Sequence, residues 1–276
     1  MENKILILGR GFIGQRLQND FNCDISNKKI FSLKDAEGEI KKYKPKIVIN
    51  CIGSTGKNNV DDCEFDKDKV LFSNAVVPII LAEAAFRNKI KLIHISSGCI
   101  YHFNYSQDKP LREEQVPDFF DLFYSRTKIY SEKALEDFSP KSNILIARIR
   151  IPLDNRPHPK NLLNKLIKYK TVIDIPNSVT YIPDFMEALK HLIKIKARGT
   201  YNIVNQNGLR YPVLLDVYKK YVPDFDYKII DQKKLGLIRT NLIMSTKKLS
   251  ETGFKVRKIE EVLEECVRSY TNKLIN

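Results

Sequence analysis

The sequence lacks several features that would place it in a specialised class of protein. It has no tryptophan, four histidines and five cysteines in 276 residues. The cysteines form no Cys-x-x-Cys pair and no zinc-ligand spacing, so neither a disulfide framework nor a zinc module is expected. We therefore expect a protein of a reducing compartment, the cytoplasm, with no bound metal.

Long apolar runs are also missing. No stretch approaches the ~20 apolar residues that a membrane-spanning helix needs, so no membrane contact is expected. Residues Met1–Lys4 run directly into a strand-like segment, and we expect no signal peptide there.

The charge is unbalanced but not clustered. The formal net charge is +14, yet no run of basic residues is longer than a Lys-Lys pair. A nucleic-acid-binding protein usually gathers its basic residues on one face or in one segment. We therefore expect no nucleic-acid partner, and an anionic small-molecule substrate would need only a local basic site.

A glycine-rich turn follows the first apolar run. Residues Lys4–Leu8 suit a buried strand and residues 15–21 can form a helix. The turn between them reads Gly-x-Gly-x-x-Gly, the dinucleotide-binding pattern in its required strand–turn–helix setting. The alternative is a tight turn without a ligand. The candidate cofactor-binding residues are Gly9, Arg10, Gly11, Phe12, Ile13 and Gly14.

The next strand, near Asn22–Ile25, is followed by Ser26-Asn27-Lys28-Lys29. An acidic residue at such a position would bind the ribose 2′-hydroxyl of NADH. Cationic and small polar side chains suit a 2′-phosphate instead, so Asn27 and Lys28 favour NADPH. The alternative is a pair of solvated lysines.

Strands and helices alternate through the first half of the chain. Apolar strands are predicted at Lys46–Gly53, Leu92–Ser97 and Asn143–Arg150, with helices at Phe72–Arg87 and Asp118–Phe138. This order predicts an α/β fold, a Rossmann-like doubly wound parallel sheet. His94 lies within a predicted strand and is expected to be a core residue.

The pattern changes after residue 151. A proline-rich loop precedes short helices at Asn161–Tyr169 and Pro183–Lys196, with a strand at Gly199–Val204. We predict a cofactor-binding domain at 1–150 and a smaller substrate-binding lobe at 151–276, from which about 174–204 returns to the first domain.

Two residues of the second long helix suggest acid–base chemistry. Tyr124 and Lys128 are four apart and so lie on one helix face. A phenol titrates near pH ~10, and a neighbouring cation favours its ionised form. The pair could also be part of a solvated helix face. The predicted strand before this helix ends in Ser96 and Ser97.

Together these features resemble the extended short-chain dehydrogenase/reductases that act on nucleotide sugars. More specifically, the chain is similar to the bifunctional nucleotide-rhamnose synthases of plants, which are 3,5-epimerase/4-reductases. The plant enzymes space their glycines as Gly-x-x-Gly-x-x-Gly, whereas this chain has Arg10 and Gly11 there. The matching stretches are Asn50–Gly56, Val60–Glu64, Gly98–Ile100, Phe123–Lys128 and Val172–Ser178.

The resemblance implies a role for each matched residue. Ser97 fits the serine role because it lies four residues before Tyr101, and Ser96 is its rival. Ser97 and Tyr124 would bind the reacting oxygen, and Lys128 would hold the nicotinamide ribose. Cys99 and Lys165 would move protons at C3 and C5 of the sugar. It also implies a homodimer through the two long helices. Further implied cofactor contacts are Cys51, Gly53 and Asn74, and implied substrate contacts are Thr55, Asn161, Asn177, Arg239 and Asn241.

The expected function is NADPH-dependent conversion of UDP-4-keto-6-deoxyglucose to UDP-L-rhamnose. One alternative is a dTDP-4-keto-rhamnose reductase without epimerase activity, which would not need Cys99. Another is a non-catalytic NADPH-binding regulator or RNA-binding relative, which would not need Ser97, Tyr124 and Lys128 together.

Overall fold

The computed structural model describes residues 4–57, 59–138, 140–235, 238 and 240–275. The chain divides into two compact units. Unit 1 comprises Met1–Ile100, Pro117–Arg148 and Lys196–Tyr201, and unit 2 comprises Tyr101–Val116, Ile149–Ile195 and Asn202–Asn276. The segment that returns to unit 1 is narrower than the expected 174–204.

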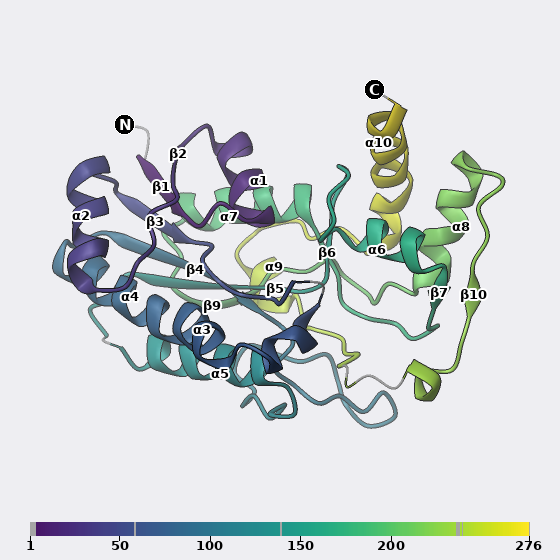
Figure 1. Cartoon of the computed structure of the whole chain (residues 1–276), viewed down its shortest axis with the longest axis horizontal. Helices are drawn as coiled ribbons and strands as arrows, with labels where there is room; N and C mark the ends of the chain where they lie inside the picture. The colour runs from purple at the N-terminus through teal and green to yellow at the C-terminus, as the bar shows by residue number, and fades with distance from the viewer. Residues whose placement is uncertain (1–3, 58, 139, 236–237, 239, 276) are drawn as a thin grey trace. The chain divides into compact units, whose positions relative to one another are not determined.

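Unit 1 is built on a parallel sheet (Figure 1). In the described part of the chain this sheet has six strands in the order β2-β1-β3-β4-β5-β9, and β1 pairs in parallel with both β2 and β3. Strand β2 is added on one side of β1, and the later strands β3, β4 and β5 are added in turn on its other side. This is the doubly wound topology expected from the sequence. The strands are β1 (Ile5–Leu8), β2 (Asp24–Ser26), β3 (Ile47–Asn50), β4 (Lys91–Ser97), β5 (Ile144–Ile149) and β9 (Gly199–Asn202).

Helices cover the sheet because their apolar faces match its buried strands. Leu6 and Leu8 of β1 pack in one core with residues of α2, α4 and α5, while α1 lies on the other side of the sheet (Figure 1). Helix α2 begins with a capping box between Ser32 and Asp35. The helices of unit 1 are α1 (Phe12–Phe21), α2 (Leu33–Tyr43), η1 (Val60–Glu64), α3 (Lys67–Leu71), η2 (Phe72–Val76), α4 (Val77–Arg87) and α5 (Phe123–Glu136).

The stretch Lys67–Arg87 is one continuous helical segment of 21 residues, with a mean hydropathy of 1.6 in its most apolar window. It is long and apolar enough to cross a membrane by length and composition, which corrects the expectation that no stretch approaches that size. Half of the window is buried, and Val77, Leu81 and Ala84 belong to the core of the sheet. A core helix of a folded domain has the same properties.

The buried face of this segment does not include all of its apolar positions. Val76 and Ile79, whose apolar spacing indicated a helix, are 36% and 39% exposed. The π-helical turn η2 inserts one extra residue per turn and so shifts the helix face.

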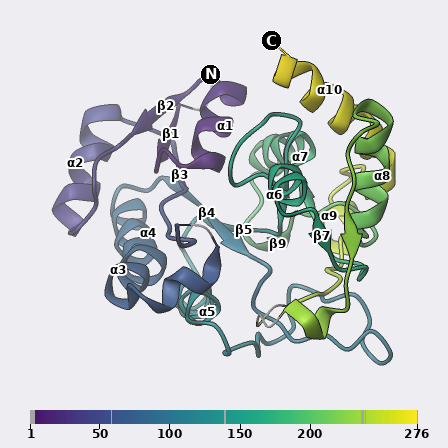
Figure 2. The same cartoon turned by 45° about the vertical axis from the view of Figure 1, so that its right-hand side comes forward.

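Unit 2 has its own apolar core, formed by α6, α8, η4 and α10 around the short strands. Figures 1 and 2 both show α8 beside α10. Its short strands pair in parallel, β6 with β8 and β7 with β10. The elements are β6 (Pro152–Leu153), α6 (Leu162–Tyr169), β7 (Thr171–Val172), β8 (Thr180–Tyr181), α7 (Ile182–Lys194), α8 (Tyr211–Tyr221), β10 (Lys228–Ile229), η3 (Gln232–Leu235), α9 (Lys247–Glu251), η4 (Ile259–Val262) and α10 (Leu263–Ile275).

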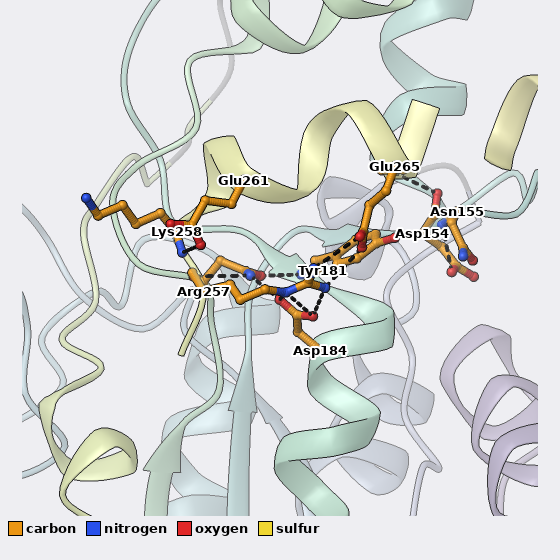
Figure 3. A network of polar contacts seen from close by, with 10 residues as sticks. Asp154, Asn155, Tyr181, Asp184, Arg257, Lys258, Glu261 and Glu265 are labelled. Atoms are coloured by element: carbon orange, nitrogen blue, oxygen red, sulfur yellow. Dashed lines mark hydrogen bonds and ion pairs between the residues drawn. The ribbon is translucent and has the colours of Figure 1, made fainter. Parts of the chain in front are cut away.

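A network of charged side chains connects α7, Arg257 and α10 within unit 2 (Figure 3). The Arg257 guanidinium donates to Asp184 at the start of α7 and to Glu265 on α10, where its Nη1 lies 3.1 Å from Oε2. Asn205 Nδ2 donates to Asp184 Oδ2 at 2.6 Å. The two carboxylates raise the pKa of Arg257, so the guanidinium stays charged.

Candidate functional site

The glycine turn after β1 is shaped by close backbone contacts. Gly9 has φ +102°, and a Cβ there would lie 2.7 Å from the carbonyl carbon of Cys51. A Cβ on Gly14 would lie 1.9 Å from the Gly9 oxygen. Space around Gly11 is open, and this residue is the N-cap of α1 and brings no side chain. The N–H groups of the first helical turn can therefore approach an anion such as a pyrophosphate.

Two further residues of the motif support the turn from α1. Phe12 is buried and Ile13 is half-buried, so both help to pack the start of the helix. Arg10 is exposed, and its carbonyl oxygen accepts a hydrogen bond from Gln15 at 3.0 Å. The Arg10 side chain is thus a surface cation beside the anion-binding turn.

Lys28, just after β2, is positioned by contacts of its backbone and of its side chain. Lys28 N donates to Ser26 Oγ at 3.0 Å, and Lys28 Nζ lies 3.4 Å from Asp35 Oδ1. Asp35 also accepts hydrogen bonds from Ser32 and the Phe31 amide, which together with Lys28 lower its pKa. Lys28 stays exposed beside Asn27, so its ammonium remains accessible to a second anion.

The loop after β3 is fixed by a buried amide. Asn74 Oδ1 accepts from Ser54 N at 2.7 Å, and its Nδ2 donates to Ser54 O at 3.0 Å and to Thr127 Oγ1 at 3.2 Å. Asn74 therefore shapes the loop that carries Cys51, Gly53 and the half-buried Thr55. This is a different task from the direct cofactor contact expected for Asn74.

Ser96 and Ser97 at the end of β4 have different partners. Ser96 Oγ is hydrogen-bonded to Glu132, whose carboxylate also holds Arg148 Nη2 at 2.6 Å. This network is buried. Ser97 Oγ accepts from Cys99 N at 3.2 Å, so its O–H remains able to donate to a substrate oxygen. The structure thus favours Ser97 over Ser96 as the reactive hydroxyl.

His94, in the middle of β4, is a core residue as expected. It is fully buried, and its Nδ1 lies 3.1 Å from Asn50 Nδ2. Burial and the nearby Lys128 lower its pKa well below the usual range, so the ring is neutral. Since Asn50 Nδ2 is a donor, Nδ1 of His94 is the acceptor.

Lys128 lies beneath the loop after β3. Its Nζ is 3.4 Å from the Ile95 carbonyl oxygen, and a Cβ added to Gly53 would lie 3.7 Å from it. Burial lowers the pKa of Lys128 to about 8, against the opposing effect of Glu132. Keeping this ammonium charged therefore costs desolvation free energy, and strongly shifted pKa values of this kind are common at functional sites.

Tyr124 and Cys99 pack in the same place. Tyr124 is 6% exposed and belongs to a small cluster with Cys63 and Val70, and the half-buried Cys99 packs against this cluster. The structure therefore brings the candidate acid–base tyrosine and the candidate thiol together. All of these residues belong to unit 1.

The candidates of unit 2 on α6 differ in exposure. Asn161 is fully buried and caps α6, accepting from the amides of Leu163 and Asp154 and donating to the carbonyls of Asp154 and Arg156. A substrate contact by Asn161 would have to compete with these bonds. Lys165, one turn along, is half-buried.

The other candidates of unit 2 form a buried polar group. Asn177 Oδ1 accepts from Arg150 Nε at 2.9 Å and its Nδ2 donates to Asn241 Oδ1 at 2.8 Å. Arg150 also donates to Thr240, with Nη2 3.0 Å from Oγ1. The sequence analysis missed Arg150. Arg239 lies outside the described residues.

A cleft of about 940 Å³ lies in unit 2, between the segment after β7 and the segment around β10. Its walls combine isoleucine side chains with a few polar groups, as is usual for a small-molecule site. It is lined by Ile173, Asp174, Ile175, Ile229, Ile230, Asp231, Gln232, Lys233 and Ile238.

Comparison with known proteins decides the family. Residues 3–207 match the model of the RmlD substrate binding domain. The chain belongs to this family. It is 30% identical over 235 residues to a trifunctional UDP-glucose 4,6-dehydratase/UDP-4-keto-6-deoxy-D-glucose 3,5-epimerase/UDP-4-keto-L-rhamnose-reductase of Arabidopsis thaliana, covering 82% of this chain and 35% of that protein.

Other RmlD-like relatives are nearer in size. A bifunctional dTDP-4-dehydrorhamnose 3,5-epimerase/dTDP-4-dehydrorhamnose reductase of Arabidopsis thaliana is 32% identical over 198 residues, 69% of this chain and 64% of that protein. The chain thus spans about a third of the trifunctional relative and just under two thirds of the bifunctional one.

Solved structures share the RmlD fold. The UDP-rhamnose synthase of Acanthamoeba polyphaga mimivirus superposes with a TM-score of 0.89 at 24% identity, covering 96% of this chain and 99% of that one. The dTDP-4-dehydrorhamnose reductase of Bacillus anthracis, solved with NADP, superposes with a TM-score of 0.83 at 19% identity, covering 99% and 100%. At these identities the likeness shows the fold alone.

One contact beside Tyr124 was not predicted, because its partners are far apart in the sequence. Glu64 lies in the resembling stretch Val60–Glu64, but nothing local gives it a task. In the structure its Oε1 accepts a hydrogen bond from Phe123 N at 2.7 Å, at the start of α5. No local sequence pattern predicts this contact, because its two partners are 59 positions apart.

Proposed function

We propose that this chain is an NADPH-dependent 3,5-epimerase/4-reductase that converts UDP-4-keto-6-deoxyglucose to UDP-L-rhamnose. The observation that carries the proposal is the packing of Cys99 against the cluster that holds Tyr124, with Ser97 at the end of the neighbouring strand. A reductase alone needs the tyrosine and the serine. The thiol beside them supports a second, proton-transferring activity.

For the reduction, the chain's residues act on the oxygen at C4 of the sugar. Ser97 donates its free O–H to this oxygen, and Tyr124 donates the proton that completes the alcohol. Lys128 binds the nicotinamide ribose and places a positive charge near Tyr124. Bound NADPH supplies the hydride for C4.

For the epimerisation, the same contacts at O4 stabilise an enolate, which makes the hydrogens at C3 and C5 exchangeable. Cys99 is proposed to exchange protons with one face of the sugar. Lys165 is proposed as the second proton-transfer group, on the ground of the sequence resemblance. Both reactions use one polarised oxygen, which explains why one chain can carry both.

NADP(H) as the cofactor is supported by the glycine turn, by Lys28 at the end of β2, and by the NADP present in the Bacillus anthracis reductase structure. The isoleucine-lined cleft of unit 2 is a candidate for the nucleotide part of the substrate. Asn177 and Asn241 are proposed substrate contacts near it in sequence. A reducing, cytoplasmic location is proposed from the five free cysteines.

A coupled assay tests the proposal. The protein is mixed with NADPH and either UDP-4-keto-6-deoxyglucose or UDP-4-keto-rhamnose, and nicotinamide absorbance is followed. Oxidation of NADPH with both sugars supports the bifunctional enzyme. Oxidation of NADPH with UDP-4-keto-rhamnose or its dTDP analogue alone supports a simple reductase. If NADPH is not oxidised with any of these sugars, the result supports a non-catalytic NADPH-binding protein.

A further inference from the structure

Helix α5 begins without any of the usual local caps. Leu122 is its N-cap residue, with extended backbone (φ −106°, ψ 137°) and an apolar side chain that cannot accept a hydrogen bond. No acidic residue occurs in the first turn of α5. The first N–H groups of a helix need acceptors, especially when the helix end is buried. The acceptor must therefore come from another part of the chain.

Glu64 provides it from 59 positions earlier in the sequence. Its Oε1 accepts from Phe123 N at 2.7 Å, a short charge-assisted hydrogen bond. Its Oε2 lies 3.4 Å from Lys67 Nζ. A carboxylate at a helix N-terminus also interacts favourably with the helix dipole. One oxygen of Glu64 thus holds the residue that directly precedes Tyr124.

Apolar contacts reinforce this hydrogen bond. Val60 and Cys63, on the same 3-10 helix as Glu64, pack in the cluster that contains Tyr124 and Cys99. The helix η1 therefore holds the start of α5 by a polar and an apolar contact together. Moving η1 would move the phenol.

The segment before η1 carries cofactor and substrate candidates. Gly56 has φ +71°, and a Cβ there would lie 1.9 Å from the Asn59 oxygen, so only glycine fits this turn. The Asn59 side chain then accepts from Asp61 N at 2.9 Å and starts η1. Gly56 and Asn59 thus lie close together, between the loop that carries Gly53 and Thr55 and the helix that carries Glu64.

We propose that Glu64 is a positioning residue for the reaction: it caps α5 and so fixes Tyr124 relative to the loop after β3. The expected loss of turnover in a Glu64 variant rests on the proposed function. The expected loosening of the start of α5 does not, because the hydrogen bond to Phe123 can be tested without substrate.

Two substitutions of Glu64 and one control test this. Glu64→Ala removes the acceptor, and Glu64→Gln keeps an amide oxygen in its place. Asp66→Ala removes a neighbouring exposed carboxylate that pairs with Lys69 rather than with α5. Amide hydrogen exchange at Phe123 and steady-state kinetics are measured for each variant.

We expect Glu64→Ala to lower kcat by about 10- to 100-fold, since small displacements of a reacting group are costly, with KM for NADPH changed less than about twofold. Exchange at Phe123 should become about tenfold faster, the effect of losing a helix cap. Glu64→Gln should recover most of both losses, and Asp66→Ala should match the wild type.

Three results would overturn the inference: unchanged kcat in Glu64→Ala, equal losses in the Gln and Ala variants, or the same loss in Asp66→Ala. Absence of turnover in the wild type would count against the proposed function instead. The exchange rate of Phe123 in Glu64→Ala would then decide alone whether Glu64 holds the helix.

Discussion

Tyr124 is the residue whose chemistry is easiest to isolate. It is buried beside Cys99 and follows the capped residue Phe123 on α5. Tyr124→Phe keeps the ring and removes only the hydroxyl. We expect kcat for sugar reduction to fall on the order of 10²- to 10⁴-fold, the contribution of a positioned general acid. The dissociation constant for NADPH, measured by fluorescence titration, should stay within about threefold. Turnover close to that of the wild type would remove Tyr124 from the mechanism.

Cys99 and Lys165 should separate the two activities. Since the proposed hydride-transfer step uses Ser97, Tyr124 and Lys128, the variants Cys99→Ala and Lys165→Ala should still reduce UDP-4-keto-rhamnose. They should form no rhamnose from UDP-4-keto-6-deoxyglucose, because proton transfer at C3 and C5 would be lost. Product analysis by NMR distinguishes the sugars. Cys23→Ala, which removes a half-buried thiol outside this cluster, is the matched control. If both variants epimerise at the wild-type rate, the proton-transfer assignment fails.

The cations near the end of β2 should select the cofactor. Lys28 is held beside the strand end by its amide bond to Ser26, where an acid would suit NADH. The catalytic efficiency with NADPH should therefore exceed that with NADH. Lys28→Ala should reduce this preference by about three- to fivefold, about 0.6 to 1 kcal/mol, the scale of one exposed charge contact. Lys34→Ala, on the exposed part of α2, is the control. Equal efficiency of the wild type with both cofactors would contradict the prediction.

Among the elements, α5 contains a buried ammonium, that of Lys128, which lowers the stability of the folded protein. Burial lowers the pKa of Lys128 from its usual value to about 8, so the folded protein loses this proton at lower pH than the unfolded chain. Between about pH 8 and 10.5 the unfolded chain binds more protons, and stability attributable to this group rises with pH. Below pH 8 the full desolvation cost remains.

Lys128→Met should accordingly stabilise the protein at pH 7 by about 1 to 3 kcal/mol while abolishing turnover. The difference from the wild type should shrink as the pH rises from 8 to 10.5. Denaturant unfolding at several pH values measures it. Lys133→Met, on the exposed face of the same helix, should show neither effect. A destabilised Lys128→Met variant at pH 7 would contradict this account of α5.

Several elements followed directly from local sequence. The buried runs of β1, β3 and β4 were recognisable because both faces of these strands are covered, which leaves continuous apolar residues. The expected helix Asp118–Phe138 is shorter in the structure, Phe123–Glu136, and its first N–H donates to Glu64 rather than to a local cap. Helix α2 was not recognised, although Ser32 and Asp35 form its capping box. Its central Gly38 weakens the local helix signal.

For the whole molecule, the sequence indicated candidate site residues better than it indicated the hydrogen-bond partners of those residues. The stretch containing Tyr124 and Lys128 was found by spacing, and Cys99 by resemblance. The hydrogen bond between Ser96 and Glu132, which favours Ser97 as the proposed reactive hydroxyl, joins residues 36 positions apart. Arg150 was missed for the same reason, since its partners Asn177 and Thr240 are distant in sequence. Such contacts follow from packing and leave no local pattern.

The exposed apolar side chains of the long helical segments support the expected homodimer. Val76, Ile79 and Phe86 are 36–41% exposed along Lys67–Arg87, and Tyr130 on α5 is 47% exposed. We expect sedimentation analysis to show a dimer, and Ile79→Lys to shift it towards monomer. Val213→Lys, an exposed position on α8, is the control. A wild-type monomer at micromolar concentration would contradict the dimer.

The proposed function requires one chain that both epimerises and reduces the sugar. It is tested by incubating the protein with NADPH and UDP-4-keto-6-deoxyglucose in deuterated water and analysing the product by NMR. We expect UDP-L-rhamnose that carries deuterium at C3 and C5, formed together with NADP⁺ in equal amounts. Consumption of NADPH without deuterium at either position, or no formation of rhamnose from this precursor, would contradict it.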